Sequence, residues 1–135
     1  MKPAILVARA IFPEVLDRLS QTFEITANQD DVVYTPAELT DKMRGKVGAL
    51  TTGSERIDAA LLAACPSLKV VANMAVGYNN IDIAAARARG IVVTNTPDVL
   101  TDATADFAFA LILAITRRLG EAERIVRAGR WQRRV

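Results

Sequence analysis

Short apolar runs alternate with amphipathic stretches along residues 1–100. Runs of this length that are rich in Val, Ile, Leu and Ala are typical of buried strands. They predict strands at 4–8, 23–27, 47–51, 69–72 and 91–94. Strands that are separated by helical stretches indicate repeated strand–helix units and a parallel sheet.

Helix-start signals lie between these runs. The segment TPAE at 35–38 is a capping box with proline at the first helical position, so it predicts a helix over 36–43. Asp58 and Asp82 are predicted N-caps of two further helices, and residues 13–19 form a fourth amphipathic stretch. The fold class that follows is α/β, a flavodoxin-like doubly wound parallel five-stranded sheet. In such sheets ligands bind outside the carboxyl ends of the strands.

A long helix is expected after the sheet. Residues 101–128 contain no strong helix breaker; Gly120 is the one weak point and Gly129 is the stop. The section 107–115 is apolar on every face, but it is only about half as long as a membrane-spanning helix. We therefore expect this section to be buried against protein and expect no membrane contact.

The composition indicates a folded protein without a secretory signal or an internal disulfide. With 135 residues and 51% hydrophobic content, the chain can bury a core and is not disordered. The apolar run after Met1-Lys2-Pro3 is too short for a secretory signal. The single cysteine, Cys65, excludes an internal disulfide and fits a reducing cytoplasm. Because the chain has no histidine to act as a base, Cys65 is expected to be a buried structural residue.

The net charge of +2 hides an asymmetry along the chain. Seven of the 17 basic residues follow residue 116, where only Glu121 and Glu123 are acidic. No aromatic platform or nucleic-acid fold motif accompanies them, so we expect a solvated helix face and no nucleic-acid partner. The basic residues are Arg117, Arg118, Arg124, Arg127, Arg130, Arg133 and Arg134.

Two loops carry the candidate chemistry. The segment VGYNNID at 76–82 follows one predicted strand, and TGSER at 52–56 follows the strand before it. Backbone N–H groups in such turns hold an anion without adding a titrating group. The sequence therefore predicts a site for a small acid at this edge of the sheet.

Three segments in order resemble the N-terminal part of the D-2-hydroxyacid dehydrogenases. They are VGYNNID at 76–82, ARGIVVTNTP at 88–97, and VLT at 99–101 with Ala105-Asp106. The resemblance covers essentially the whole chain. It is closest to the glyoxylate/hydroxypyruvate reductase and 2-ketogluconate reductase branch, and the chain is similar also to phosphite dehydrogenase.

The resemblance implies roles for individual positions. Val76 and Gly77 would offer backbone N–H groups to the carboxylate of a small 2-keto or 2-hydroxy acid, and Gly53 and Ser54 would line the other side of the cleft. Thr104 would lie beside the nicotinamide end of NAD or NADP. Some members have a lysine where this chain has Val76, so a direct ion pair at that position is not expected here.

The resemblance also implies a domain organisation. Residues 1–100 would form the substrate-binding domain, and residues 101–135 the helix that crosses into a dinucleotide domain. The part of this helix over 101–119 would help to form a homodimer.

The departures from the family pattern concern catalysis. In the family the catalytic arginine, acidic residue and histidine all come later in the chain. None of the seven glycines here forms G-x-G-x-x-G, and hydride transfer needs a bound nicotinamide and a proton donor. We therefore expect a fragment with no catalytic residue, no metal site, no tightly bound cofactor and no activity alone. The choice of 2-keto acid and of NADH or NADPH is not readable from these residues.

Two alternatives stay open. The chain could be an independent flavodoxin-like module that binds a small anion, although residues 9–13 lack the hydroxyl-rich loop of a flavin site and the acidic residues of a receiver domain. It could also be a dimerising piece, carried by the apolar helix.

Overall fold

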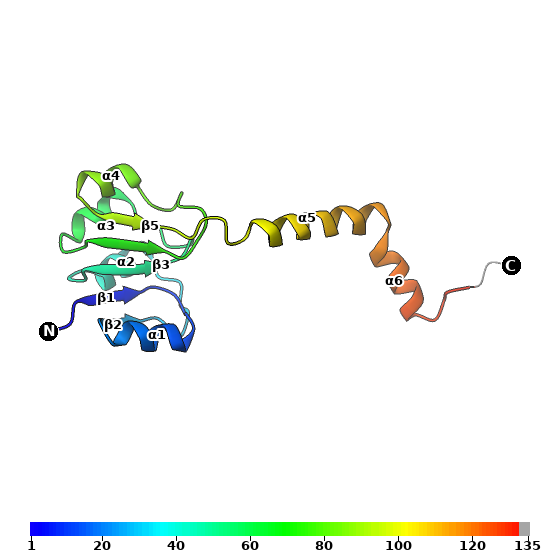
Figure 1. Ribbon diagram of the computed structural model, residues 1–135, viewed down its shortest axis with the longest axis horizontal. Helices are drawn as coiled ribbons and strands as arrows, with labels where there is room; N and C mark the ends of the chain where they lie inside the picture. Colours follow the sequence, from blue (N-terminus) through cyan, green and yellow to red (C-terminus); the bar gives the residue numbers. More distant parts are fainter. Residues whose placement is uncertain (133–135) are drawn as a thin grey trace. The chain divides into compact units, whose positions relative to one another are not determined.

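The chain forms two units, Met1–Pro97 and a second that begins at Asp98, in a computed structural model that describes residues 1–132. The first unit is built on a parallel five-stranded sheet (Figure 1). Its strands are β1 (Ala4–Val7), β2 (Glu24–Ala27), β3 (Gly48–Thr51), β4 (Val70–Asn73) and β5 (Val92–Thr94). The strand order is β2-β1-β3-β4-β5, the flavodoxin-like order that the sequence predicted. Each strand begins and ends within one residue of its predicted bounds.

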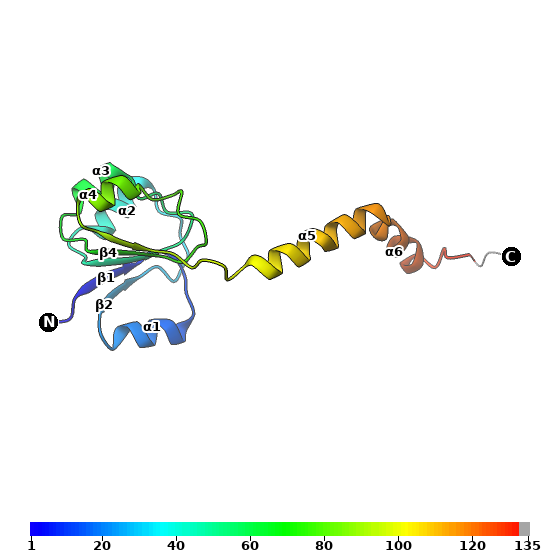
Figure 2. The ribbon, with the colours of Figure 1, turned by 45° about the horizontal axis from the view of Figure 1, so that its top comes forward.

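Four helices cover the sheet. They are α1 (Pro13–Ser20), α2 (Pro36–Met43), α3 (Ala59–Ala64) and α4 (Ile83–Ala88). Figure 2 shows α1 on one face of the sheet and the other three on the opposite face. The capping box of Thr35 is confirmed, and the side chains of Asp58 and Asp82 accept hydrogen bonds from the N–H groups of Leu61 and Ala85. These local caps explain why the helix starts could be predicted accurately.

The core lies between the sheet and the layer of α2, α3 and α4. Leu6 and Val71 from the sheet and Met43 and Leu62 from the helices are fully buried within it. Cys65 belongs to the same cluster, and burial raises the pKa of its thiol. The expectation of a buried structural cysteine is thus confirmed.

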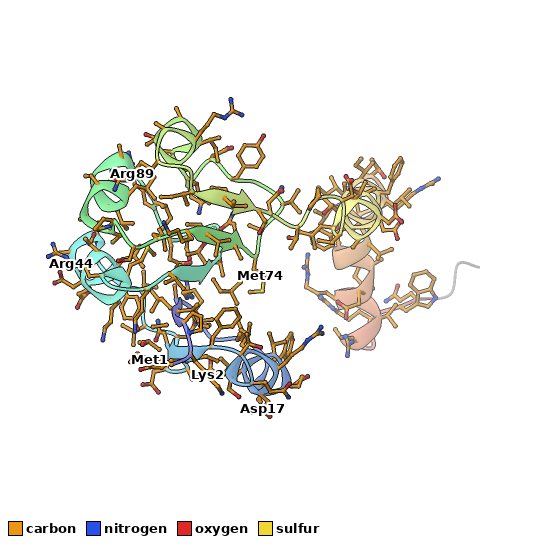
Figure 3. All side chains as sticks on the ribbon, turned by 60° about the vertical axis from the view of Figure 1, so that its left-hand side comes forward. Met1, Lys2, Asp17, Arg44, Met74 and Arg89 are labelled. Carbon is orange, nitrogen blue, oxygen red and sulfur yellow. The ribbon has the colours of Figure 1, made fainter. Side chains whose placement is uncertain are left out.

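Figure 3 labels side chains on both sides of the sheet. Arg44 and Arg89 lie on the outer side of the layer formed by α2, α3 and α4. Met74, directly after β4, lies on the other side of the sheet, where α1 is.

The second unit contains two consecutive helices, α5 (Thr101–Thr116) and α6 (Leu119–Arg127), so the expectation of one unbroken helix to Ala128 was wrong. The break lies at Arg118, whose φ of 51° is left-handed and interrupts the helical hydrogen-bond ladder. The Arg118 guanidinium pairs with Glu121, 2.6 Å away, at the start of α6. Gly120 is not the break, whereas Gly129, with φ of 66°, ends α6 as expected.

Within this unit α5 contacts α6 at one end, and its large apolar side chains stay exposed. Phe109 is 67% exposed and Ile115 is 76% exposed. Across residues 1–132, no helix combines the length and the apolar character needed to cross a membrane.

The arginines of the second unit lie in solvent as far as the structure describes them. Arg118 and Arg127 pair with Glu121 and Glu123 of their own helix. Arg133 and Arg134 lie outside the described residues.

Candidate functional site

The loops that follow β3 and β4 run side by side at the carboxyl edge of the sheet. The register of the sheet pairs Thr51 with Asn73 as the last residues of the two strands. Beyond them, the N–H of Ile57 donates to the carbonyl of Asn80 at 2.8 Å, and Ile57 forms a parallel bridge with Ile81. The structure therefore brings together the two loops that the sequence singled out.

Two asparagine side chains join these loops from inside. Asn73, 2% exposed, accepts a hydrogen bond from the Thr51 hydroxyl at 3.1 Å. Asn80 donates through Nδ2 to the carbonyls of Thr52 at 3.0 Å and Glu55 at 2.9 Å. The two amides also face each other, with both N···O distances at 3.4 Å. The pattern of the sequence does not reveal this pair, because only the register of the sheet brings the two side chains together.

The turn at 75–77 is held through three successive carbonyl groups. The carbonyl of Ala75 accepts from the backbone N–H of Thr96 at 2.9 Å. The next, that of Val76, accepts from Asn95 Nδ2 at 2.8 Å. The third, that of Gly77, accepts from Asn73 Nδ2 at 3.0 Å.

These contacts decide where the N–H groups of the turn point. In a trans peptide the C=O and the next N–H lie in one plane and point in opposite directions, and the chain has no cis peptide among its described residues. Each of the N–H groups of Val76, Gly77 and Tyr78 therefore points away from the donor that binds the carbonyl of its own peptide unit. Within the described residues, none of these three N–H groups has an acceptor. The turn therefore has three adjacent backbone N–H groups left to donate to a ligand, and backbone donors of this kind bind anions.

The turn is also open to solvent at its glycine. Val76 is 39% exposed and Tyr78 is 51% exposed. Among the described residues, no heavy atom lies within 4 Å of the position that a Cβ of residue 77 would take, and the Gly77 backbone is not in the left-handed region. Gly77 is therefore not required by the fold, and it leaves space in which a ligand can approach the backbone.

The second loop is organised around the buried carboxylate of Glu55, which is 6% exposed. This carboxylate accepts hydrogen bonds from the N–H of Thr52 at 2.7 Å and from the hydroxyl of Ser54 at 2.7 Å. The N–H of Gly53 has no acceptor within the part of the chain that is described. Ser54 thus uses its hydroxyl to shape the loop, while Gly53 keeps a free backbone donor.

Arg9, which follows β1, holds this loop from the other side. Its Nη1 donates to Ser54 Oγ at 2.7 Å and lies 3.6 Å from a Glu55 oxygen. Its Nε and Nη2 bind the Asp31 carboxylate at 2.7 and 2.9 Å. The guanidinium hydrogen bond, together with the N–H of Ala10, lowers the pKa of Asp31 to about 2, and the same pairing raises the pKa of Arg9. No role for Arg9 was predicted from the sequence, although a charged residue directly after a predicted strand is a signal for a position at the carboxyl edge of the sheet.

Thr104 lies in the second unit, on the first turn of α5. Its N–H donates to the carbonyl of Leu100 at 2.9 Å, and its side chain is exposed. Over residues 1–132 no group of three or more side chains is arranged to ligate a metal.

Comparison with known proteins gives a consistent result. Residues 5–126 match the family described as D-isomer specific 2-hydroxyacid dehydrogenase, catalytic domain. The glyoxylate reductase of Pyrococcus horikoshii is 50% identical over 136 residues, and that of Thermococcus onnurineus is 47% identical over 134. Each alignment covers 99% of this chain and 40% of the relative. The chain thus spans about 40% of the length of these curated relatives.

Solved structures agree. The NADPH-dependent glyoxylate/hydroxypyruvate reductase of Sinorhizobium meliloti, in complex with NADP and malonate, is similar with a TM-score of 0.75 and 44% identity. That alignment covers 97% of this chain and 40% of the reductase. A 2-hydroxyacid dehydrogenase from Ketogulonicigenium vulgare aligns over 100% of this chain and 45% of its own, with a TM-score of 0.76 and 35% identity.

Proposed function

Since the chain belongs to the family of D-isomer specific 2-hydroxyacid dehydrogenases, we propose that it forms the substrate-binding portion of an NAD(P)-dependent 2-keto acid reductase. The family resemblance that the sequence carried is confirmed, and the curated relatives are glyoxylate reductases. The substrates we propose for the whole protein are glyoxylate, hydroxypyruvate or 2-ketogluconate.

One observation carries the proposal for this chain. The N–H groups of Val76, Gly77 and Tyr78 are adjacent, have no acceptor within the described residues and lie beside an open glycine. A carboxylate accepts several hydrogen bonds at once, and such charge-assisted bonds to backbone N–H groups are strong. We therefore assign the carboxylate of the 2-keto acid to the Val76–Gly77 turn. The malonate bound by the Sinorhizobium meliloti reductase supports a site of this family for small carboxylates.

Gly53 and Ser54 are proposed to line the other side of the same site. The free N–H of Gly53 adds a donor, while the Ser54 hydroxyl is occupied by Glu55 and Arg9. Ser54 would therefore line the site without donating its hydroxyl to the substrate, because this hydroxyl already donates to the Glu55 carboxylate.

The cofactor of the whole protein is proposed to be NAD or NADP, as the NADP complex of the Sinorhizobium meliloti reductase supports. When bound, it supplies the hydride that reduces the keto carbonyl. Thr104, which is exposed, is proposed to lie beside the nicotinamide end of this cofactor. The seven glycines form no G-x-G-x-x-G phosphate loop, so residues 1–135 fit only one end of this cofactor. We therefore expect no tight cofactor binding by this chain.

The roles of the two parts of the chain are also proposals. Residues 1–100 would be the substrate-binding domain and residues 101–135 the connection to a dinucleotide domain. The exposed apolar side chains of α5 support a homodimer through residues 101–119, because burying each large apolar side chain contributes about 1.5–3 kcal/mol. A cytoplasmic location rests on the lone, buried Cys65.

The site can be tested by titrating the 15N-labelled chain with glyoxylate or oxalate. We expect millimolar ligand to shift the amide resonances of residues 76–78 and 53–54 and to leave those of α1 and α6 unchanged. Shifts centred elsewhere, or no shifts at millimolar ligand, would contradict the assignment.

A further inference from the structure

We infer that Asn73 and Asn95 are positioning residues that set the direction of the N–H groups in the Val76–Gly77 turn. The inference rests on the proposed function in one respect, since it takes the turn to be the carboxylate site. It goes further by naming the side chains that prepare the turn for its ligand, which lie outside the turn itself.

Asn95 orients the N–H of Gly77 through a single hydrogen bond. Asn95 directly follows β5, and its Nδ2 reaches across to the Val76 carbonyl at 2.8 Å. That carbonyl shares a peptide unit with the N–H of Gly77. Holding the oxygen therefore fixes the orientation of this N–H, since the peptide unit is planar and trans.

The contact of Asn73 acts on the next peptide unit. Its Nδ2 donates to the Gly77 carbonyl at 3.0 Å, which fixes the N–H of Tyr78 in the same way. Asn73 is itself fixed, because it is buried, accepts from Thr51 and faces the amide of Asn80. The peptide unit between Gly77 and Tyr78 is thus held by a side chain of β4 that itself contacts Thr51 of β3 and the amide of Asn80.

The openness of the turn explains why such support is needed. Within residues 1–132, no atom lies within 4 Å of the Cβ position at Gly77, so no packing contact from this part of the chain opposes rotation of the adjacent peptide units. Glycine also has the widest choice of backbone conformations. Without partners for the two carbonyls, the peptide units could rotate and turn their N–H groups away from a ligand. A turn that is already oriented binds more tightly because it loses less conformational freedom on binding.

Asn95→Ala is the most informative substitution, because Asn95 is only half-buried and its side chain makes this one hydrogen bond among the described residues. The matched control is Asn79→Ala, which removes an exposed asparagine side chain within the same loop. Asn79 makes no side-chain hydrogen bond in the described part of the chain. Both variants are expected to keep the circular dichroism spectrum and thermal midpoint of the parent chain.

The first readout needs no ligand. The 15N resonance of an amide responds to a hydrogen bond at the carbonyl of its own peptide unit. Asn95→Ala should therefore move the Gly77 15N resonance and leave that of Tyr78 nearly in place. Asn73→Ser should move the Tyr78 15N resonance and leave that of Gly77 nearly in place. Asn79→Ala should not move one of these two resonances without the other. An unchanged Gly77 resonance in Asn95→Ala would overturn the inference.

The second readout is the dissociation constant for oxalate, obtained by titration of each variant. Loss of one orienting hydrogen bond should weaken binding about three- to tenfold in Asn95→Ala, with no loss in Asn79→Ala. Equal affinities of Asn95→Ala and the parent chain would overturn the inference. If the parent chain binds no oxalate, the proposed function fails, and the ligand-free resonances still decide whether the two amides orient the turn.

Discussion

Removal of the Asn80 side chain should destabilise the first unit far more than removal of its neighbour. Asn80→Ala deletes the donor that serves the carbonyls of Thr52 and Glu55 and removes the partner amide of Asn73. Both hydrogen bonds are part-buried, so water replaces the lost donor only in part. Leaving a part-buried acceptor unpaired costs about 1–1.5 kcal/mol, the low end of the range for buried groups, so the two acceptors together predict a loss of about 2–3 kcal/mol in the free energy of unfolding.

The assay is thermal and urea unfolding of the parent chain, Asn80→Ala and Asn79→Ala, followed by circular dichroism. For a unit of this size, the predicted loss corresponds to a fall of about 10–20 °C in the thermal midpoint. Asn79→Ala should stay within about 0.5 kcal/mol of the parent, because an exposed side chain without partners contributes little.

A loss below about 0.5 kcal/mol in Asn80→Ala, or a loss equal to that of Asn79→Ala, would refute the reasoning. It would mean that the two carbonyls find other partners easily. The amide pair would then not be what joins the two loops.

Four further outcomes are expected. Gly77→Ala should keep the stability of the chain, because the new Cβ meets no atom of the described residues, but it should weaken oxalate binding by crowding the turn. Gly120→Ala, whose Cβ would have an ordinary contact at 3.7 Å, is the control for the titration. The pKa of Asp31 is lowered from 3.8 to about 2 on folding, so its contribution to stability should be present above about pH 4 and lost as the pH falls toward 2. Asp31→Asn should therefore flatten the dependence of the unfolding midpoint on pH between 4 and 2; an unchanged slope would count against the Arg9 pairing. Light scattering at micromolar concentration should give a dimer that weakens when Phe109 and Ile112 are replaced by aspartate, whereas a stable 14.6 kDa monomer would contradict dimerisation. The chain alone should not oxidise NADH or NADPH with glyoxylate, and turnover above a heat-treated control would contradict that expectation.

The fold was predictable because its signals are local. Each strand is a short apolar run, and Thr35, Asp58 and Asp82 cap helices through contacts only three residues away. The break at Arg118 had no such signal, because no proline or glycine stands there. An arginine with a left-handed backbone conformation is uncommon, and the local sequence does not predict one.

The candidate site was predictable only in its outline. Loops at the carboxyl ends of neighbouring parallel strands must meet, so the segments 52–56 and 76–82 could be named from the sequence. The contacts that shape them join residues far apart in the chain, such as Arg9 with Ser54 and Asn95 with Val76. Their pairing depends on the register of the sheet, which a pattern of apolar and polar residues does not specify to single side chains.

The central claim is that the turn at Val76–Gly77 holds a carboxylate through backbone N–H groups. The most direct test is a crystal structure of the chain with oxalate. It should show a carboxylate oxygen within about 2.7–3.2 Å of at least two of the nitrogens of Val76, Gly77 and Tyr78, with the Val76 carbonyl still on Asn95. Oxalate bound to Arg9 in place of Asp31, or absent from the turn at saturating concentration, would contradict the account.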